Sequence, residues 1–212
     1  MRTHATAIAA LLTIVGSSSG QTSWDNAAGG LWSVASNWSP ADVPNSLTES
    51  AVLGNLGGDY AVTCDISTTI LGLTVQSDAL LEINGGQLLG VDAGGVLNNG
   101  HIFINRTGSG SNTIVQSTMP MSILGTGLIE LNSQALDLND ASLQAQAGAE
   151  LTIGAGQTVS GSGTMAGPVV LLGVVDADRD GRDLRVIGTV DMTGGGTLQG
   201  TNNGSILLQG QI

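Results

Sequence analysis

The sequence has few positive charges and a single cysteine. It contains no lysine, and five arginines face 17 aspartates and glutamates, which gives a formal net charge of −12. Surfaces that bind nucleic acid or anionic lipid need clustered cations, so the composition argues against both as partners. Cys64 has no second cysteine to pair with, which excludes an internal disulfide. Because His101 is the only histidine after residue 20, we interpret Cys64 as a small buried apolar residue and not as a nucleophile.

Long hydrophobic runs are also scarce. The apolar run at residues 5–15 follows Arg2 and precedes a small, polar stretch at 16–20. This is the layout of a secretory signal peptide, so we expect residues 1–20 to be removed on export. No later segment approaches the roughly 20 apolar residues that span a bilayer. The mature chain is therefore expected to lack a transmembrane segment and to be secreted or held at the cell surface.

Helical periodicity is absent, and short strand patterns take its place. Nowhere do apolar residues recur at i, i+3 and i+4 over three turns. Short runs instead alternate apolar and polar residues, as a strand with one buried face does, and glycine-rich tripeptides that favour turns separate them. The sequence therefore predicts an all-β protein. The runs lie at 71–75, 80–83, 101–104, 128–131, 135–138, 150–153 and 183–187, and the predicted turns at 84–86, 93–95, 98–100, 125–127, 154–156 and 161–163.

Two all-β architectures are consistent with this pattern, a sandwich or barrel and a parallel β-helix. A sandwich or barrel normally carries core aromatics, whereas this chain relies on Leu, Ile and Val, and its strand–turn–strand unit recurs about every 20 residues. Coils stacked about 4.8 Å apart place such side chains in register, and large rings do not fit their narrow interior. We favour a parallel β-helix over residues 59–212, with the sandwich as the alternative.

All three tryptophans, Trp24, Trp32 and Trp38, lie in the first part of the predicted mature chain. A solenoid has an open first coil, whose unpaired backbone and exposed core need an atypical cap. Large rings cover such an end efficiently, so we interpret residues 21–58 as an N-terminal cap. The alternative is a carbohydrate-binding module, in which these rings form an exposed platform for a sugar.

The segment 174–186 is the densest cluster of charge. Its aspartates resemble the start of a calcium loop, since hard Ca²⁺ binds several oxygens on a tight turn and Gly181 allows the bend. Position 187 is isoleucine where a bidentate glutamate is expected. The two interpretations are a structural calcium site and a solvated turn whose aspartates are neutralised by neighbouring arginines. The candidate ligands are Asp176, Asp178, Asp180 and Asp183, and the arginines are Arg179, Arg182 and Arg185.

The start of the chain resembles known exported proteins. The stretch 24–53, followed by YAVTCDISTTILGLTV and LLEINGGQL, is similar to the opening of secreted bacterial β-solenoid proteins. These are autotransporter passengers with β-strand repeats and large exported repeat proteins of the cell surface. The resemblance covers residues 24 to about 90 and implies a right-handed β-helix, export and a role as a surface passenger or adhesin, without catalytic residues. Because the sequence ends on GSILLQGQI, which looks like the middle of a coil, we expect the native chain to continue past Ile212.

These features together predict a non-catalytic, exported structural or adhesive protein. Its partner is expected to be an extracellular glycan or a cell-surface receptor. It requires no cofactor, with structural Ca²⁺ as the one candidate. A polysaccharide lyase or hydrolase is the remaining alternative, because some β-helices use clustered aspartates with calcium and an arginine base. Here, however, the aspartates lie on one turn, and no aromatic residue follows Phe103 to hold a sugar.

Overall fold

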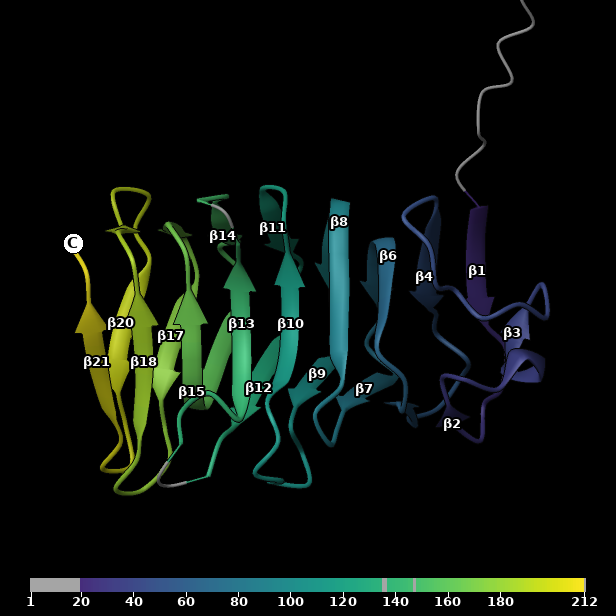
Figure 1. Cartoon of the computed structure of the whole chain (residues 1–212), viewed down its shortest axis with the longest axis horizontal. Coiled ribbons are helices and arrows are strands. Elements are labelled where there is room, and N and C mark those ends of the chain that lie inside the picture. The colour runs from purple at the N-terminus through teal and green to yellow at the C-terminus, as the bar shows by residue number, and fades with distance from the viewer. Residues whose placement is uncertain (1–19, 135–136, 147, 212) are drawn as a thin grey trace, which may run out of the picture.

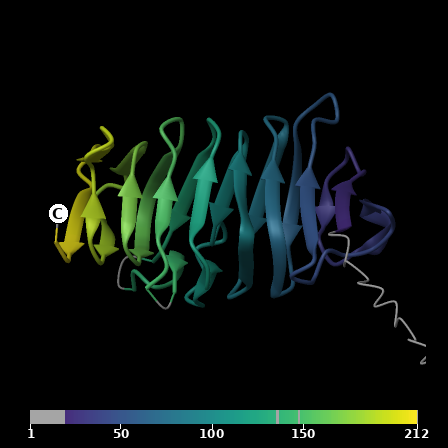
Figure 2. The same cartoon turned by 90° about the horizontal axis from the view of Figure 1, so that it is seen from above.

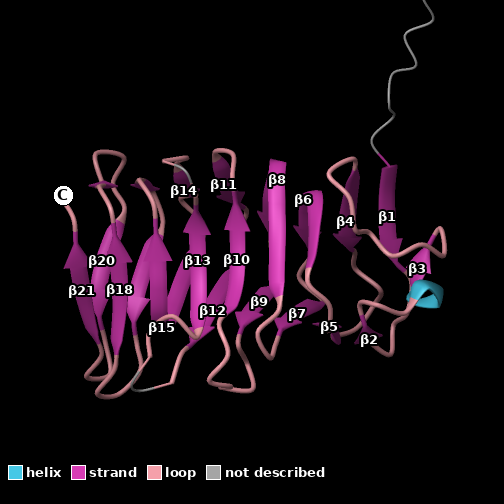
Figure 3. Cartoon of the chain, viewed as in Figure 1, coloured by secondary structure: helices cyan, strands magenta, loops and turns pink. Residues whose placement is uncertain are grey.

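The computed structural model describes residues 20–134, 137–146 and 148–211. These residues form 21 strands, and their one helical segment is the short 3-10 turn η1 (Ala35–Asn37). Strands follow one another along the long axis, from β1 (Gly20–Trp24) at one end to β21 (Ser205–Gln209) at the other (Figure 1). Figure 3 shows η1 at the β1 end. The described part is thus all-β, as the sequence predicts, and no helix in it has the length and apolar character to cross a membrane.

The sheet is parallel. Among the named strands, β1 and β3 (Trp38–Ser39) form the one antiparallel pair, and all the other pairs are parallel. Each strand pairs with others roughly 15 to 30 residues away in sequence. Pairing of this kind requires a crossover between partners, which the intervening strands supply.

The pairing gathers the strands into three rows, and three bent strands each belong to two of them. The first row is β6 (Thr68–Val75), β8 (Leu88–Asn98), β10 (Thr113–Ser117), β13 (Ala141–Ala145), β15 (Thr158–Ala166), β18 (Asp183–Ile187) and β21. The second row is β1, β4 (Glu49–Leu53), β6, β8, β11 (Met121–Leu124), β14 (Leu151–Ile153), β16 (Val169–Leu171) and β19 (Val190–Asp191). The third row is β2 (Gly30–Leu31), β5 (Tyr60–Cys64), β7 (Ala79–Ile83), β9 (His101–Ile104), β12 (Leu128–Asn132), β15, β17 (Val174–Ala177) and β20 (Thr197–Gly200).

From β5 onward the chain visits these rows in a fixed order. It passes from the third row to the first, then to the second, and returns to the third beside the strand it left. Figure 2 shows the resulting succession of strands from above. Alternate side chains point inward, as the burial of β5 illustrates, where every second residue is buried. One inward ladder consists of Val62, Leu81, Ile102, Ile129, Val159 and Val175, which stand opposite one another in register and are at most 2% exposed.

Most predicted strands are confirmed, and two predicted turns are not. The runs at 101–104 and 183–187 coincide with β9 and β18. The sequence predicts turns at the glycine-rich tripeptides 93–95 and 161–163, but these residues lie inside β8 and β15. Gly95 and Gly161 have positive φ there, so the strand bends from one row to the next without ending. The run predicted at 135–138 falls partly on residues outside the described ranges, and Asp137 forms only an isolated bridge with Gln134.

The predicted signal peptide lies almost wholly outside the described residues. The last residue of the predicted peptide, Gly20, begins β1, where it stands opposite Glu49, and its amide donates to the Thr48 carbonyl at 2.8 Å. The predicted boundary therefore falls one residue inside this first strand.

Candidate functional site

The three tryptophans form one buried cluster at the β1 end of the molecule. Trp24 is 2% exposed, Trp32 is fully buried and Trp38 is 2% exposed. Trp38 lies between the other two, with ring centroids 5.0 Å from Trp24 and 4.7 Å from Trp32, both edge-to-face. Such T-shaped pairs are favourable beyond the area they bury. The cluster belongs to the same core as the inward ladders of the strands, as expected for a cap.

Each indole N–H of the cluster donates to a backbone carbonyl. Trp24 Nε1 donates to Asn26 at 2.7 Å, Trp32 Nε1 to Pro44 at 3.3 Å and Trp38 Nε1 to Trp32 at 2.8 Å. Two asparagines brace the same loop, since Asn26 Nδ2 donates to Asn37 Oδ1 at 3.0 Å. A platform for sugar needs a ring face open to solvent, and none of these rings has one. We therefore do not assign a carbohydrate site to the tryptophans.

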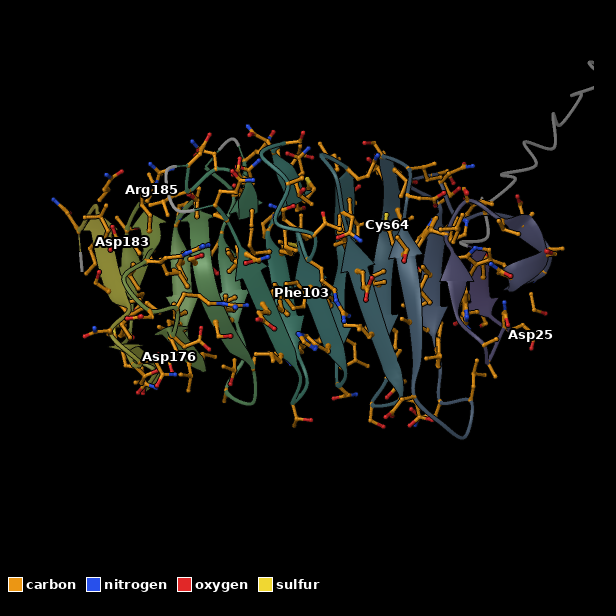
Figure 4. All side chains as sticks on the ribbon, turned by 90° about the horizontal axis from the view of Figure 1, so that it is seen from below. Asp25, Cys64, Phe103, Asp176, Asp183 and Arg185 are labelled. Carbon is orange, nitrogen blue, oxygen red and sulfur yellow. The ribbon has the colours of Figure 1, made fainter. Side chains whose placement is uncertain are left out.

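The segment that contains Asp176, Asp178, Asp180 and Asp183 lies near the opposite end of the molecule from Asp25 (Figure 4). Asp176 accepts from Gln199 and Thr201, Asp180 from Asn203 and Asp183 from Ser205, while Asp178 Oδ1 is buried without a hydrogen-bond partner. No three His, Cys, Asp or Glu side chains of the described residues come together as a metal site. Asp176, Asp180 and Asp183 are thus bound separately by the neighbouring strand and turn, whereas Ca²⁺ requires carboxylates that converge on one point.

The neighbouring arginines do not neutralise these aspartates. Arg179 pairs with Glu130 of β12, and Arg182 Nη1 donates to the Ser133 carbonyl at 2.6 Å. Arg185 Nη2 donates to Thr164 Oγ1 at 2.9 Å and to Asn139 Oδ1 at 2.5 Å. The expectation of local neutralisation is therefore wrong, because each guanidinium reaches across to residues two or more strands earlier in the chain. The lyase or hydrolase alternative needs an arginine beside the aspartates, and these are engaged elsewhere.

A polar cluster lies instead on the outward side of the third row. Glu82, Phe103 and Glu130 stand opposite one another on β7, β9 and β12. Arg106 pairs with Glu82, and its guanidinium lies 5.7 Å from the centre of the Phe103 ring. His101 Nε2 lies 3.3 Å from Glu130 Oε2. These contacts connect successive strands of the third row. The charged side chains of the cluster are therefore engaged with one another across neighbouring strands.

Glu130 and Cys64 are among the titratable groups whose pKa values are shifted. Burial acts to raise the pKa of Glu130, but His101, whose Nε2 lies 3.3 Å from the carboxylate, and the positive charges of Arg179 and Arg106 outweigh it and lower that pKa below 4.5. Burial raises the pKa of Cys64 to about 12, and its Sγ donates to the Ile66 carbonyl at 3.3 Å. A thiol of that kind is neutral at physiological pH and inert as a nucleophile, as the sequence indicates.

The sequence gives no signal for the buried amide groups at the corners between rows. Asn98 is fully buried, and its Nδ2 donates to Gln157 Oε1 at 3.1 Å, while Gln157 Nε2 donates to the Asn98 carbonyl at 2.6 Å. Asn105 is fully buried and donates to the Asn132 carbonyl at 3.1 Å. These partners satisfy backbone groups that the turns leave without a strand partner. Their role is structural, and it becomes apparent only once the strand register shows which residues lie opposite one another.

The comparisons with known proteins add no family to this description. Searches against family models, curated proteins and solved structures find no match to the chain.

Proposed function

We propose that the chain forms a right-handed parallel β-helix that serves as a non-catalytic, rigid structural or adhesive segment outside the cell. The observation that carries the proposal is the continuous in-register parallel stacking of three rows along the described length. Repeated crossovers between parallel strands are right-handed in nearly all known cases, which supports the handedness. Residues 21–58 act as the cap and residues 59–212 as the coils.

The use of the charged side chains supports the non-catalytic part of the proposal. Glu82, Glu130 and Arg179 form ion pairs that connect neighbouring elements. Three of the aspartates at 176–183 accept from adjacent side chains, namely Asp176, Asp180 and Asp183. Such an arrangement strengthens a rod, because each contact connects one strand or turn to the next. The strongly acidic surface keeps the rod soluble.

Fractionation of the native producer tests the location. An antibody raised against residues 59–211 is expected to detect the protein in the medium or the cell envelope, and a band confined to the cytosol would overturn the proposal. Its apparent mass also reports whether the native chain continues past Ile212.

A deletion strain and the purified protein test the role. Loss of the gene is expected to weaken surface attachment, and expression of the protein to restore it. Purified protein incubated with a panel of plant and microbial polysaccharides is expected to release no reducing ends. Release that depends on Asp180, and is lost in Asp180→Asn, would replace the structural proposal with an enzymatic one.

A further inference from the structure

The outward face of the second row carries no charge over six of its strands. β4, β6, β8, β11, β14 and β16 stand side by side in register, and Figure 1 shows β4 to β14 in this order along the long axis. Buried residues such as Val96 and Ile123 alternate there with outward residues, none of which is acidic or basic. The third row differs, because Glu82 and Glu130 occupy its outward positions. In a chain with a net charge of −12, the uncharged face is where a second copy can approach with little repulsion.

Two leucines form the centre of an apolar ridge on this face. Leu97 and Leu124 stand opposite each other on β8 and β11, and they are 42% and 51% exposed. Thr74 and Val52 continue the same ladder on β6 and β4. We call these four residues the ridge. Single exposed leucines are common on soluble proteins, whereas adjacent ones on an uncharged face indicate an interaction surface.

A strip of small residues runs beside the ridge, two positions earlier in each strand. It consists of Ser50, Gly72, Gly95 and Ser122. Gly72 and Gly95 have no side chain, and the backbone that lies beside Gly72 belongs to another glycine, Gly94. The strip is therefore lower than the ridge. It lies about 7 Å to one side of the ridge, because two residues of a strand span that length.

We propose that this face binds a second copy of the chain, with the two rods side by side and parallel. A two-fold axis that runs along the rods, between ridge and strip, places the ridge of each copy over the strip of the other. The match repeats at every layer, because both copies have the same spacing between strands. Leu97 then faces Gly95 of the second copy, and Leu124 faces Ser122. Rods in opposite directions would instead stack ridge on ridge.

The charges at the borders of the face favour the same orientation. Glu49 begins β4, and Glu150 directly precedes β14, so both lie at the border where the strands begin. At the other border, the first two residues after each of β4, β6, β8, β11 and β14 are uncharged. Parallel rods bring the acidic border of each copy against the uncharged border of the other. Antiparallel rods would bring the two acidic borders together.

The size of the face sets the expected affinity. Six strands about 4.8 Å apart and a width of about 16 Å give roughly 900 Å² of buried surface for the two copies together. This is below the standard size of a stable interface, so we expect a weak, reversible dimer with a dissociation constant of tens of micromolar. The inference goes beyond the proposed function and does not depend on where the protein acts.

Sedimentation equilibrium of the purified protein tests the dimer. The mean mass is expected to rise from that of one chain to that of two between about 1 and about 300 µM. Leu97→Asp and Leu124→Asp each bury a carboxylate in the contact and are expected to weaken association at least tenfold. Leu124→Lys reduces the net negative charge, so it would strengthen non-specific association, but it is expected to weaken this dimer as well.

Leu47→Asp is the matched control for these variants. Leu47 is 53% exposed, and it lies near Thr69 and Gly90 of the first row. The same change at this position is expected to leave the dissociation constant unchanged. Thermal melts of all variants at low concentration compare the stability of the monomers, and because the substituted side chains point outward, we expect small differences.

Disulfide formation tests the orientation. Ser122→Cys mixed with Leu124→Cys is expected to give a crosslinked pair under mild oxidation, because parallel rods place these positions opposite each other. The native Cys64 is fully buried and does not compete. Leu97→Cys mixed with Leu124→Cys is the comparison, and faster crosslinking in that mixture would overturn the parallel arrangement.

The remaining outcomes decide whether the face is an interface between copies. A monomeric mass over the whole range, or association that survives Leu97→Asp and Leu124→Asp, overturns the proposal. So does a monomer that co-sediments with phosphatidylcholine vesicles and loses this binding in Leu124→Asp, because the ridge would then contact lipid. Each measurement uses purified protein, so a failed dimer leaves the proposed function intact, and a cytosolic location leaves the dimer intact.

Discussion

Cys64 shows how a single buried group makes stability depend on pH. The residue is fully buried on β5, and burial raises the pKa of its thiol from 9.0 to about 12. The folded state therefore holds the proton more tightly than the unfolded state does. The associated stability is fully present below pH 9 and is lost as the pH rises from 9 to 12.

The expected loss is about 4 kcal/mol over the whole range, at about 1.4 kcal/mol per pKa unit, and about 3 kcal/mol of it falls below pH 11. Chemical unfolding at pH 8 and pH 11 measures it, and Cys64→Ala is expected to show a distinctly smaller decrease between the two. The native thiol is also expected to resist a thiol-specific reagent at pH 8 unless denaturant is added. Rapid labelling of the folded protein would contradict the burial.

Gly161 shows how one backbone position fixes a bend. It lies within β15 at φ +104°, where a Cβ would come within 2.0 Å of the Leu131 carbonyl oxygen. The obstacle is the backbone of the adjacent strand, which cannot rotate away. Gly161→Ala therefore combines strained φ with a steric clash, and we expect a loss of about 3 kcal/mol or more in the free energy of unfolding.

Gly58→Ala is the matched control, because nothing lies within 4 Å of its Cβ and its φ is not positive. This substitution is expected to be neutral or to stabilise by less than about 1 kcal/mol. Thermal melts of Gly161→Ala and Gly58→Ala give the two melting temperatures to be compared. Equal melting temperatures would mean that the bend at Gly161 tolerates a side chain.

At the scale of elements, the segment from β17 to β18 allows a direct test of cation binding. Each of Asp176, Asp180 and Asp183 accepts from a different side chain of the next layer. We therefore expect millimolar CaCl₂ and a chelator to give the same melting temperature within error. A rise with Ca²⁺ would require the carboxylates to rearrange into a common site, because an ion that binds only the folded state must stabilise it.

The cluster around Glu130 ties β9, β12 and the turn after β17. The pKa of Glu130 is lowered below 4.5 by the partners that outweigh its burial. Its contribution to stability is therefore present above about pH 4.5 and is lost as the pH falls through the lower pKa of the folded state. Because His101 and Arg179 are about one-third exposed, we expect a contribution of about 1 kcal/mol or less.

Glu130→Gln is expected to lower stability at pH 7 and to flatten the decline between pH 5 and pH 3. Glu150→Gln is the control, because that glutamate is exposed and has no ion pair among the described residues. Urea unfolding at pH 7, 5 and 3 measures both variants. An unchanged acid slope in Glu130→Gln would contradict the assigned coupling.

The elements were predictable only where their pattern is local. Alternation alone locates β9 and β18 to the residue, because each strand has one inward face. It cannot distinguish a glycine that bends a continuous strand from one that ends it, which is why 93–95 and 161–163 were predicted as turns. The contact of Arg179 with Glu130 spans 49 residues, and that of Asn98 with Gln157 spans 59. Both require the register, which no short window of sequence encodes.

At the scale of the whole molecule, the tryptophan cluster determines how the β1 end of the stack is closed. Trp38 contacts both other rings, and its Nε1 donates to the Trp32 carbonyl. Trp38→Ala removes the centre of the cluster and is expected to cost roughly 3–5 kcal/mol. It also opens the core at the β1 end, and the apolar surface exposed there favours association with other copies.

Melting temperature and light scattering, measured together, separate a cap from a binding platform. Trp38→Ala is expected to melt well below the parent protein and to form larger particles as its concentration rises. Phe103→Ala is the control, because that ring lies on the outward side of the third row, is partly exposed and contacts His101 and Arg106 instead of the core. It is expected to cost less and to stay monodisperse. If Trp38→Ala instead kept its melting temperature and lost binding to an insoluble glycan, the buried cluster would be a ligand site and the β1 end would need another explanation for its closure.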